Sequence, residues 1–331
     1  MSDRVNNETP EKLPVIRPER KHALLLVLIA IVGLFAASLL VGLFLPQSAS
    51  PLHQLLAMDV FYYLPFMVLP VALIMRKRGS LGALRPNPIA PGDVFLIIPL
   101  ALMGVLVVNY IITLWAIPLQ KLGLDVYASE SIPTAHSTRE LVLSVLAAAV
   151  FPGVCEEFLF RGAVLPAYER FGTKRAVLIT AALFTILHGS LAGLPSQFLL
   201  GVIMGTVVVL TDSIYAGLIY HTVHNAALLI WQFMLDARVR GVDTSETQDI
   251  LSSLGGANGV AVLIFGIAQL GIWMGLILMI MRRRARNRGL EIQPPQKQKM
   301  RGSERALLAL IVLIALLLYL VEILAMAGGL K

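Results

Sequence analysis

Long uninterrupted apolar segments dominate the chain. Residues 23–45 contain no charged side chain, and about 20 apolar residues are enough for a helix to cross roughly 30 Å of hydrocarbon. Further segments of this kind follow at about 57–75, 92–117, 141–163, 175–190, 196–211, 213–235, 259–281 and 306–327. The pattern predicts an all-α, polytopic transmembrane helix bundle of nine spans. Because 175–190 and 196–211 are short, eight spans and one short or re-entrant element is the alternative.

The composition excludes ordinary soluble domains. Of 331 residues, 57% are hydrophobic and 14% are charged, whereas soluble domains carry about 25% charged residues. The first span follows a polar leader of 22 residues, and it is longer than the apolar core of a cleavable signal, about 7–15 residues. We therefore expect this span to be retained. The single cysteine, Cys155, excludes an internal disulfide and a cysteine-based zinc cluster.

The basic residues predict the orientation of the spans. If the leader is cytoplasmic, 22 of the 27 Lys and Arg residues fall on the cytoplasmic side and 5 on the outer side, as the positive-inside rule requires. The net charge of +7 does not indicate a nucleic-acid partner, because the cations flank spans instead of forming one folded face. We expect a multi-pass protein of a bacterial-type plasma membrane with a cytoplasmic N-terminus.

Two adjacent acids lie inside the fourth span, where burial of charge is costly and each ionisable residue is a functional candidate. Glu157 and Arg161 are four residues apart, which favours an ion pair along one helix face. Glu156 lies about 100° around the helix from Glu157, so it can face the bundle interior. We expect Glu157 and Arg161 to neutralise each other and Glu156 to remain available for chemistry.

The fifth and seventh spans carry histidines that can lie near Glu156. Glu156 precedes Gly172 by 16 residues and His188 follows it by 16, so a hairpin at Gly172 would place both at a similar depth. His221 and Asn225 share one face of the seventh span, with His224 beside them. A carboxylate, two imidazoles and a carboxamide in one pocket suit hydrolysis by an activated water, with donors for the oxyanion of a tetrahedral intermediate.

Other interpretations of these residues remain. Glu156, His188 and His221 could instead bind zinc with an open position for water, although the zinc motif of two histidines four apart around a glutamate is absent. Each histidine could be a packing residue, and Asn225 could join helices. A proton-coupled transporter and a non-catalytic membrane scaffold are alternative functions, but no internal repeat supports an inverted-repeat transporter.

Three ordered motifs resemble a known family. Glu156-Glu157-Phe158-Leu159-Phe160-Arg161 has two glutamates and an arginine four positions on; Phe184 precedes His188 by four, and His221 precedes Asn225 by four. Together they are similar to the CPBP group of CAAX proteases and bacteriocin-processing enzymes, also called Abi, which includes the Rce1-type prenyl-protein endopeptidases.

The resemblance implies an intramembrane endopeptidase that opens toward the cytoplasm. It assigns activation of water to Glu156 and His188, and stabilisation of the oxyanion to His221 and Asn225. Supporting roles fall to Glu157, Arg161, Phe184 and His224. A glutamate mechanism without a metal or other cofactor is favoured over a zinc mechanism. The expected partners are a peptide or membrane-protein substrate and the lipid bilayer, and prenylated proteins are one substrate class among several.

The chain divides into regions on these grounds. We expect a cytoplasmic leader at 1–22, an N-terminal transmembrane region at 23–140, a catalytic core at 141–235, an outer loop and span at 236–281, a basic cytoplasmic linker at 282–305 and a C-terminal span at 306–331. The resemblance covers only the core, so nothing about the substrate follows from the flanking regions.

Overall fold

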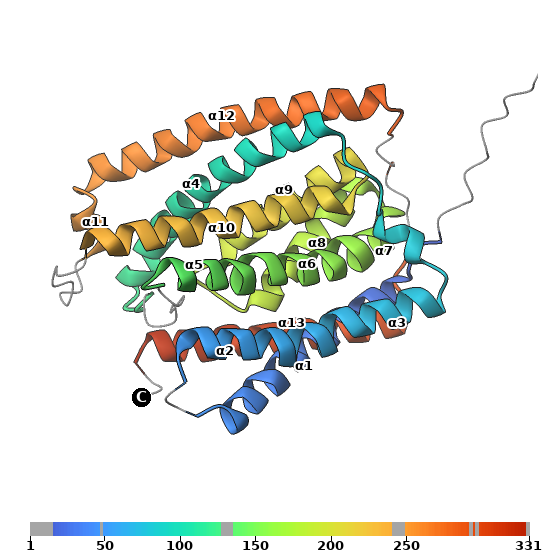
Figure 1. Ribbon diagram of the computed structural model, residues 1–331, viewed down its shortest axis with the longest axis horizontal. Coiled ribbons are helices and arrows are strands. Elements are labelled where there is room, and N and C mark those ends of the chain that lie inside the picture. The colour runs from blue at the N-terminus through green and yellow to red at the C-terminus, as the bar shows by residue number, and fades with distance from the viewer. Residues whose placement is uncertain are drawn as a thin grey trace, which may run out of the picture.

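The protein is a bundle of long helices. The computed structural model describes residues 16–46, 49–126, 135–239, 249–290, 294 and 298–328, in which all regular structure is helical (Figure 1). The remaining parts of the predicted leader, outer segments and basic linker lie outside the described residues. The elements are α1 (Arg20–Phe44), α2 (Pro51–Met58), η1 (Asp59–Val68), α3 (Leu69–Lys77), η2 (Leu81–Leu84), α4 (Pro91–Lys121), α5 (Thr138–Val145), η3 (Leu146–Val150), α6 (Phe151–Glu157), η4 (Phe158–Val164), α7 (Leu165–Glu169), α8 (Thr173–His188), α9 (Leu194–Thr211), α10 (Ile214–Val239), α11 (Ile250–Ser253), α12 (Ala257–Asn287) and α13 (Gly302–Met326).

Among the residues that the structure describes, seven helices are long and apolar enough to cross a membrane: Arg20–Phe44, Leu52–Lys77, Pro91–Lys121, Thr138–Glu169, Leu194–Thr211, Ala257–Asn287 and Gly302–Met326. The remaining predicted segments correspond to α8 and α10, which lie beside them in the bundle (Figure 1). The all-α, polytopic bundle is therefore confirmed. Both ends of each predicted segment lie within about six residues of the ends of the corresponding helix in the structure. The proposed division into domains stays a prediction.

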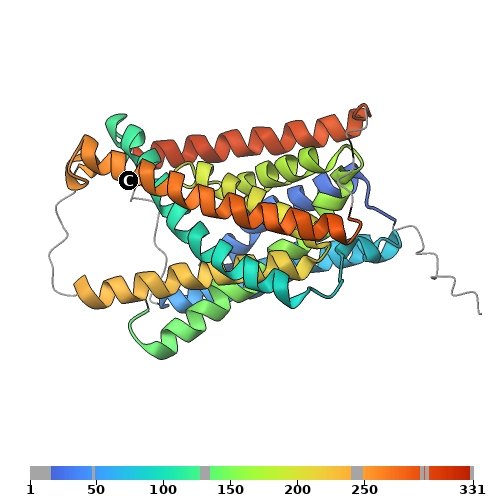
Figure 2. The same cartoon turned by 90° about the horizontal axis from the view of Figure 1, so that it is seen from above.

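The helices run back and forth along the long axis of the molecule (Figures 1 and 2). The inner ends predicted from the basic residues, such as the end of α3, the α9–α10 turn and the end of α12, gather at the end of the bundle where α1 begins. Burial separates the centre from the periphery: 56% of the most apolar stretch of α9 is buried, against 6% in α12 and 11% in α13. The last two helices therefore lie on the outside of the bundle.

Proline shapes the helices that reach the centre. The helix Thr138–Glu169 contains two π-helical stretches, η3 and η4, each followed closely by a proline, Pro152 and Pro166. A proline has no N–H to donate and its ring clashes with the carbonyl four residues earlier, and a wider π turn relieves that clash. The same holds for η1, which contains Pro65. The helix Thr138–Glu169 continues through both prolines.

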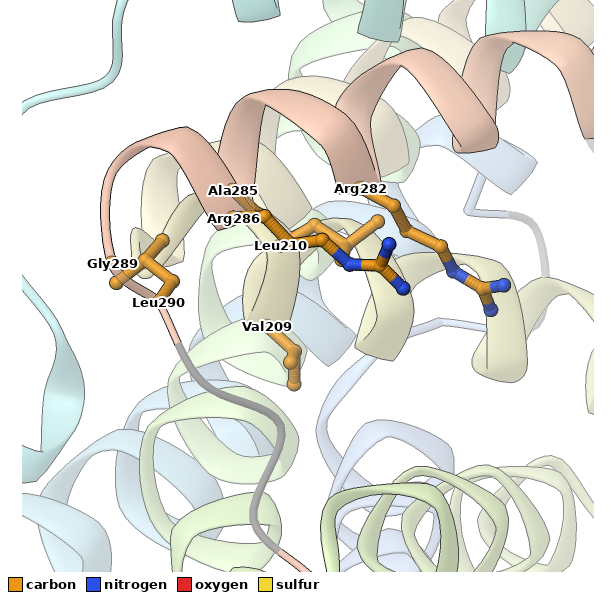
Figure 3. A pocket seen from close by; sticks show the side chains of 7 residues that line it. All are labelled: Val209, Leu210, Arg282, Ala285, Arg286, Gly289 and Leu290. Atoms are coloured by element: carbon orange, nitrogen blue, oxygen red, sulfur yellow. The ribbon is translucent and has the colours of Figure 1, made fainter.

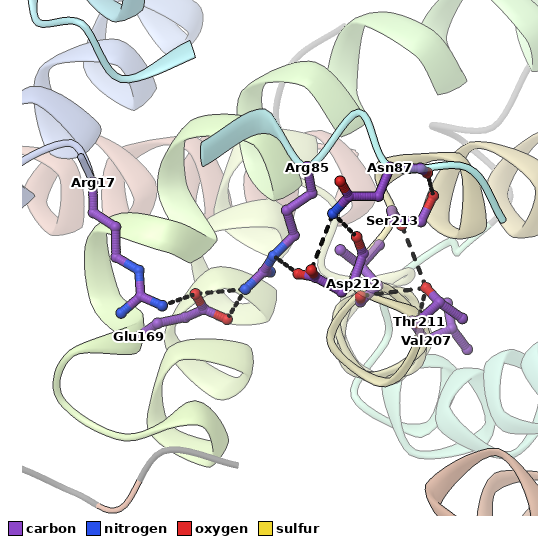
Figure 4. Close-up of polar contacts among 9 residues, drawn as sticks. Arg17, Arg85, Asn87, Glu169, Val207, Thr211, Asp212 and Ser213 are labelled. Atoms are coloured by element: carbon purple, nitrogen blue, oxygen red, sulfur yellow. Dashed lines mark hydrogen bonds and ion pairs between the residues drawn. The ribbon is translucent and has the colours of Figure 1, made fainter. Parts of the chain in front are cut away.

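A polar corner joins the N-terminal region to the inner ends of the central helices (Figure 4). Arg85 donates to both carboxylate oxygens of Glu169 at 2.6 and 2.7 Å, and its Nε lies 2.9 Å from Oδ1 of Asp212. Asn87 donates to the carbonyl and the carboxylate of Asp212. Since Glu169 ends α7 and Asp212 forms the α9–α10 turn, this corner fixes three central helices relative to one another.

Candidate active site

Three helices bring one carboxylate and two imidazoles together. Glu156 lies near the end of α6, His188 ends α8 and His221 lies in α10. One carboxylate oxygen of Glu156, Oε2, is 3.9 Å from Nε2 of His188 and 3.9 Å from Nε2 of His221. The proximity of Glu156 and His188 predicted from their spacing is thus confirmed, and Gly172 makes the turn between them with a φ of 104°, which favours glycine.

The same oxygen has no direct partner. Oε2 of Glu156 is buried and accepts no hydrogen bond from any described residue. Buried polar atoms of proteins nearly always have a protein or water partner. A separation of 3.9 Å is too long for a direct hydrogen bond, but a water molecule can bridge Glu156 to either ring. The arrangement therefore provides a binding position for a water in contact with a carboxylate.

The other carboxylate oxygen of Glu156 accepts a hydrogen bond from a tyrosine that the sequence analysis did not identify. Tyr63, in η1, donates from its hydroxyl to Oε1 of Glu156 at 3.1 Å. Its ring packs edge-on against Phe151, with centroids 6.0 Å apart, and lies 4.8 Å from the ring of Tyr62. The only signal in the sequence was a tyrosine pair inside the second span, and a single sequence does not show which helix packs against it.

The second acid of the fourth span belongs to a buried ion pair. Glu157 Oε1 accepts from Arg161 at 2.7 Å and lies 3.2 Å from Nδ1 of His221. The side chains of Glu157 and Arg161 are both fully buried, and Arg161 also donates to the carbonyl of Gly201 at 3.1 Å. The predicted pairing of Glu157 with Arg161 is confirmed. The pair does more than neutralise charge, because its carboxylate orients the ring of His221.

A glycine makes room for this pair. A Cβ atom at Gly217, in α10, would lie 2.2 Å from Oε2 of Glu157 and 2.9 Å from Cγ2 of Val208. Both distances are far shorter than a van der Waals contact, so a side chain here would displace the carboxylate or separate the helices. The close approach of α10 to the fourth span, which brings His221 to Glu156, thus depends on glycine at this position.

The ring of His188 is oriented by its own helix. Its Nδ1 lies 2.9 Å from the carbonyl of Phe184, and a carbonyl can only accept, so Nδ1 carries the proton and Nε2 faces Glu156 with a free lone pair. The ring of Phe184 lies 4.4 Å from that of His188 and 6.1 Å from that of His221. The side chain of His188 is 30% exposed, against 7% for Glu156, so the site is accessible from the His188 side.

The loop that follows His188 is held by the last helix. Glu322, in α13, accepts hydrogen bonds from the backbone N–H of Leu191 and, at 3.4 Å, from the hydroxyl of Ser190. The C-terminal span therefore contacts the edge of the site through which His188 is exposed.

The remaining motif residues lie farther along α10. Asn225 donates from Nδ2 to the carbonyl of Ala148 at 3.4 Å. Pro152, four residues after Ala148, has no N–H to offer that carbonyl, so Asn225 compensates for the proline. Among the described contacts, Asn225 makes none with Glu156 or with either ring near it. One of its two amide hydrogens remains free for another acceptor.

His224 packs against a different helix from the other motif residues. It is buried, stacks on Tyr220 with centroids 6.1 Å apart, and hydrogen-bonds to the backbone of Ala101 in α4. A Cβ atom at Gly104 of the same helix would lie 3.4 Å from Nδ1 of His224 and 2.3 Å from the hydroxyl of Tyr220. The structure therefore places His224 in the contact between α10 and α4, and not with the other motif residues.

The three central side chains lie farther apart than the ligand atoms of a bound zinc ion would. A tetrahedral ion with bonds of about 2.0–2.1 Å would hold its ligand atoms about 3.3 Å apart, whereas Glu156 Oε2 is 3.9 Å from both Nε2 atoms. Within the described parts of the chain, no group of three or more His, Cys, Asp or Glu side chains could hold a metal ion.

The comparisons with known proteins agree with the motifs. Residues 138–227 match the family described as type II CAAX prenyl endopeptidase Rce1-like. No curated protein and no solved structure matches the chain. The matched segment contains Glu156, Glu157, Arg161, His188, His221 and Asn225, but it leaves out Tyr63 and Glu322. Residues 138–227 of the chain therefore match the Rce1-like family of type II CAAX prenyl endopeptidases, as the resemblance of its three motifs indicated.

Proposed function

We propose that the protein is an intramembrane endopeptidase that hydrolyses a peptide bond of a membrane-associated protein or peptide. The observation that carries this proposal is the buried, unpartnered Oε2 of Glu156, at 3.9 Å from two imidazole nitrogens. Oε2 of Glu157 is also buried without a partner, but it faces Gly217, whereas Oε2 of Glu156 faces two imidazole nitrogens. A general base needs one oxygen free to accept a proton from water.

The reaction follows from the two acceptors that face the water. Oε2 of Glu156 removes one proton from the water. Nε2 of His188 accepts a hydrogen bond from the other hydrogen of the water and so fixes its orientation. The water oxygen then attacks the carbonyl carbon of the substrate, which forms a tetrahedral intermediate. When the C–N bond breaks, Glu156 returns its proton to the amine, so that the carboxylate is regenerated and a carboxylic acid and an amine leave.

His221 and Asn225 supply donors for the oxyanion. Because Nδ1 of His221 faces Glu157, Nε2 can donate only when the ring carries a proton on each nitrogen. A carboxylate faces each nitrogen of this ring, Glu156 at Nε2 and Glu157, which is paired with Arg161, at Nδ1. Asn225 adds its free amide hydrogen. Loss of one such donor typically lowers kcat by about 10²–10³.

Tyr63 acts through Glu156 as a positioning residue. Its hydrogen bond to Oε1 fixes the rotation of the carboxylate, so that Oε2 points at the two rings. The contribution is geometric, since a carboxylate that turns freely would present the wrong oxygen for part of the time.

The membrane topology is also a proposal. The gathering of the basic helix ends at one end of the bundle supports a cytoplasmic N-terminus in the plasma membrane and, with nine crossings, an outer C-terminus. A C-terminal alkaline phosphatase fusion would be active under this topology, since the enzyme matures only outside the cytoplasm. An inactive fusion at normal expression would overturn it.

The test is cleavage of a quenched-fluorescence peptide library by purified protein. Glu156→Gln keeps the size of the side chain and an acceptor for Tyr63 but cannot act as a base, so we expect a loss of about 10³-fold or more with an unchanged unfolding temperature. A chelator should leave wild-type cleavage unchanged within a factor of two. Full activity of Glu156→Gln would refute the proposal, and chelator-sensitive cleavage would replace the water mechanism by a metal one.

A further inference from the structure

A basic groove opens at the inner end of the bundle between α8, α9 and α12. Two adjoining cavities, of about 410 and 420 Å³, share Val209, Leu210, Arg282 and Arg286 as lining residues. Figure 3 shows the guanidinium groups of Arg282 and Arg286 extending in the same direction along the groove. The groove is separate from the candidate active site, since none of its lining residues belongs to the three motifs.

Four of the arginines at the end of α12 form two pairs with different surroundings. Arg284 and Arg288 are held by Asp93 of α4, each at 2.6 Å, and this pairing attaches the helix end to the bundle. Arg282 and Arg286, two residues away from them along the helix, are exposed and make no hydrogen bond or ion pair with any residue in the described part of the chain. The second pair therefore has no role in holding α12 in place.

A third cation lies on the opposite wall. Lys174, near the start of α8, lines the same groove and is likewise exposed without a partner in the described residues. No acidic side chain lines either cavity. Three unpaired cations that face one space repel each other, and an anion between them removes this repulsion. The groove therefore favours the binding of a negatively charged group.

The rest of the groove is apolar. Its walls include Val177, Leu178 and Val202, and the side chain of Leu178 is 48% exposed. These residues lie on α8 and α9, next to the cations and toward the middle of the two helices. A small soluble anion would need only the cations, whereas a ligand that uses the whole groove has an anionic head and an apolar chain.

We propose that this groove binds one anionic phospholipid. Its phosphate lies among Lys174, Arg282 and Arg286, and one acyl chain packs along Leu178 and Val202. Basic pockets between transmembrane helices at a cytoplasmic surface suit such headgroups, and the site is at the end of the bundle where the cations gather. The bound lipid joins α12 to α8 on the side opposite to the contact of α12 with Asp93.

Native mass spectrometry of the purified full chain in mild detergent tests this. Wild-type protein should retain one phosphatidylglycerol per chain in preference to phosphatidylcholine by about tenfold or more, since each nearby cation favours an anionic lipid about fivefold. The variant Lys174→Gln/Arg282→Gln/Arg286→Gln should lose this preference.

The matched control removes the same charge from neighbouring positions. Arg175→Gln/Arg283→Gln/Arg305→Gln changes three exposed arginines that line neither cavity, and it should keep the wild-type preference. If both variants lost the preference for phosphatidylglycerol equally, the preference would depend only on the net charge of the protein, and the proposed site would be refuted. Retention by the first variant would overturn it as well, as would displacement of the lipid by an equal concentration of glycerol phosphate.

Discussion

The Rce1-like segment at 138–227 and the helices that precede it contribute to the site in different ways. The segment supplies the acid and both facing imidazoles, yet one of its histidines, His224, turns away to pack on α4. The preceding helices carry no motif, yet Tyr63 reaches into the site and holds Glu156. The limits of the family match are therefore not the limits of the site, because helix packing decides which side chains meet.

The two regions also differ in how their polar groups are satisfied. Inside the segment, Glu157, Arg161 and His221 form a fully buried network that needs no residue from outside. Across the boundary, the hydrogen bond from Tyr63 connects the preceding helices to the carboxylate of Glu156. We expect changes inside the network to affect folding and activity together, and changes at the boundary to affect activity alone.

The largest effect is expected from Glu157→Gln. It leaves the buried guanidinium of Arg161 without a balancing charge, and breaking a buried ion pair costs about 3–5 kcal/mol. Thermal unfolding in detergent should show a large drop in stability, and cleavage should be lost because His221 no longer has a carboxylate at Nδ1.

The double variant Glu157→Gln/Arg161→Met separates the loss of stability from the loss of cleavage. An apolar replacement for the arginine removes the uncompensated charge, so the unfolding temperature should recover most of the loss, while cleavage should stay absent. If Glu157→Gln alone keeps wild-type stability, the network is not the structural centre of the segment.

Tyr63→Phe is expected to have an intermediate effect. It removes only the hydroxyl that donates to Glu156, and a hydrogen bond to a charged group is worth about 1.5–3 kcal/mol, so kcat should fall about tenfold or more. The substrate KM and the unfolding temperature should change little, because the ring still packs on Phe151.

The neighbouring tyrosine is the control. The hydroxyl of Tyr62 is buried and has no hydrogen-bond partner in the described residues, so Tyr62→Phe removes the same group without affecting Glu156. It should leave kcat unchanged. Equal effects of the two substitutions would show that the N-terminal region supports the site only through packing.

The sequence predicts some of these features and not others, for physical reasons. The spans follow from apolar runs of bilayer length, and the Glu157–Arg161 pair follows from helix periodicity, because both are local properties. The hydrogen bond of Tyr63 and the contact of Asn225 with the carbonyl of Ala148 join separate helices. Which faces of two helices meet depends on their rotation, and π-helical turns change that rotation in ways that a regular 3.6-residue period does not anticipate.

The smallest effect is expected from His224→Gln. The sequence places His224 beside His221 on one helix, but the structure places it against Tyr220 and Ala101, where a glutamine amide can still bond to the backbone. Cleavage by this variant should stay within about threefold of wild type, whereas His221→Gln should lose about 10²-fold or more. A loss in His224→Gln as large as that in His221→Gln, at an unchanged unfolding temperature, would mean that His224 contacts the substrate. The contact between α10 and α4 would then have to open during catalysis, and the N-terminal region would be a moving part of the site and not a fixed support.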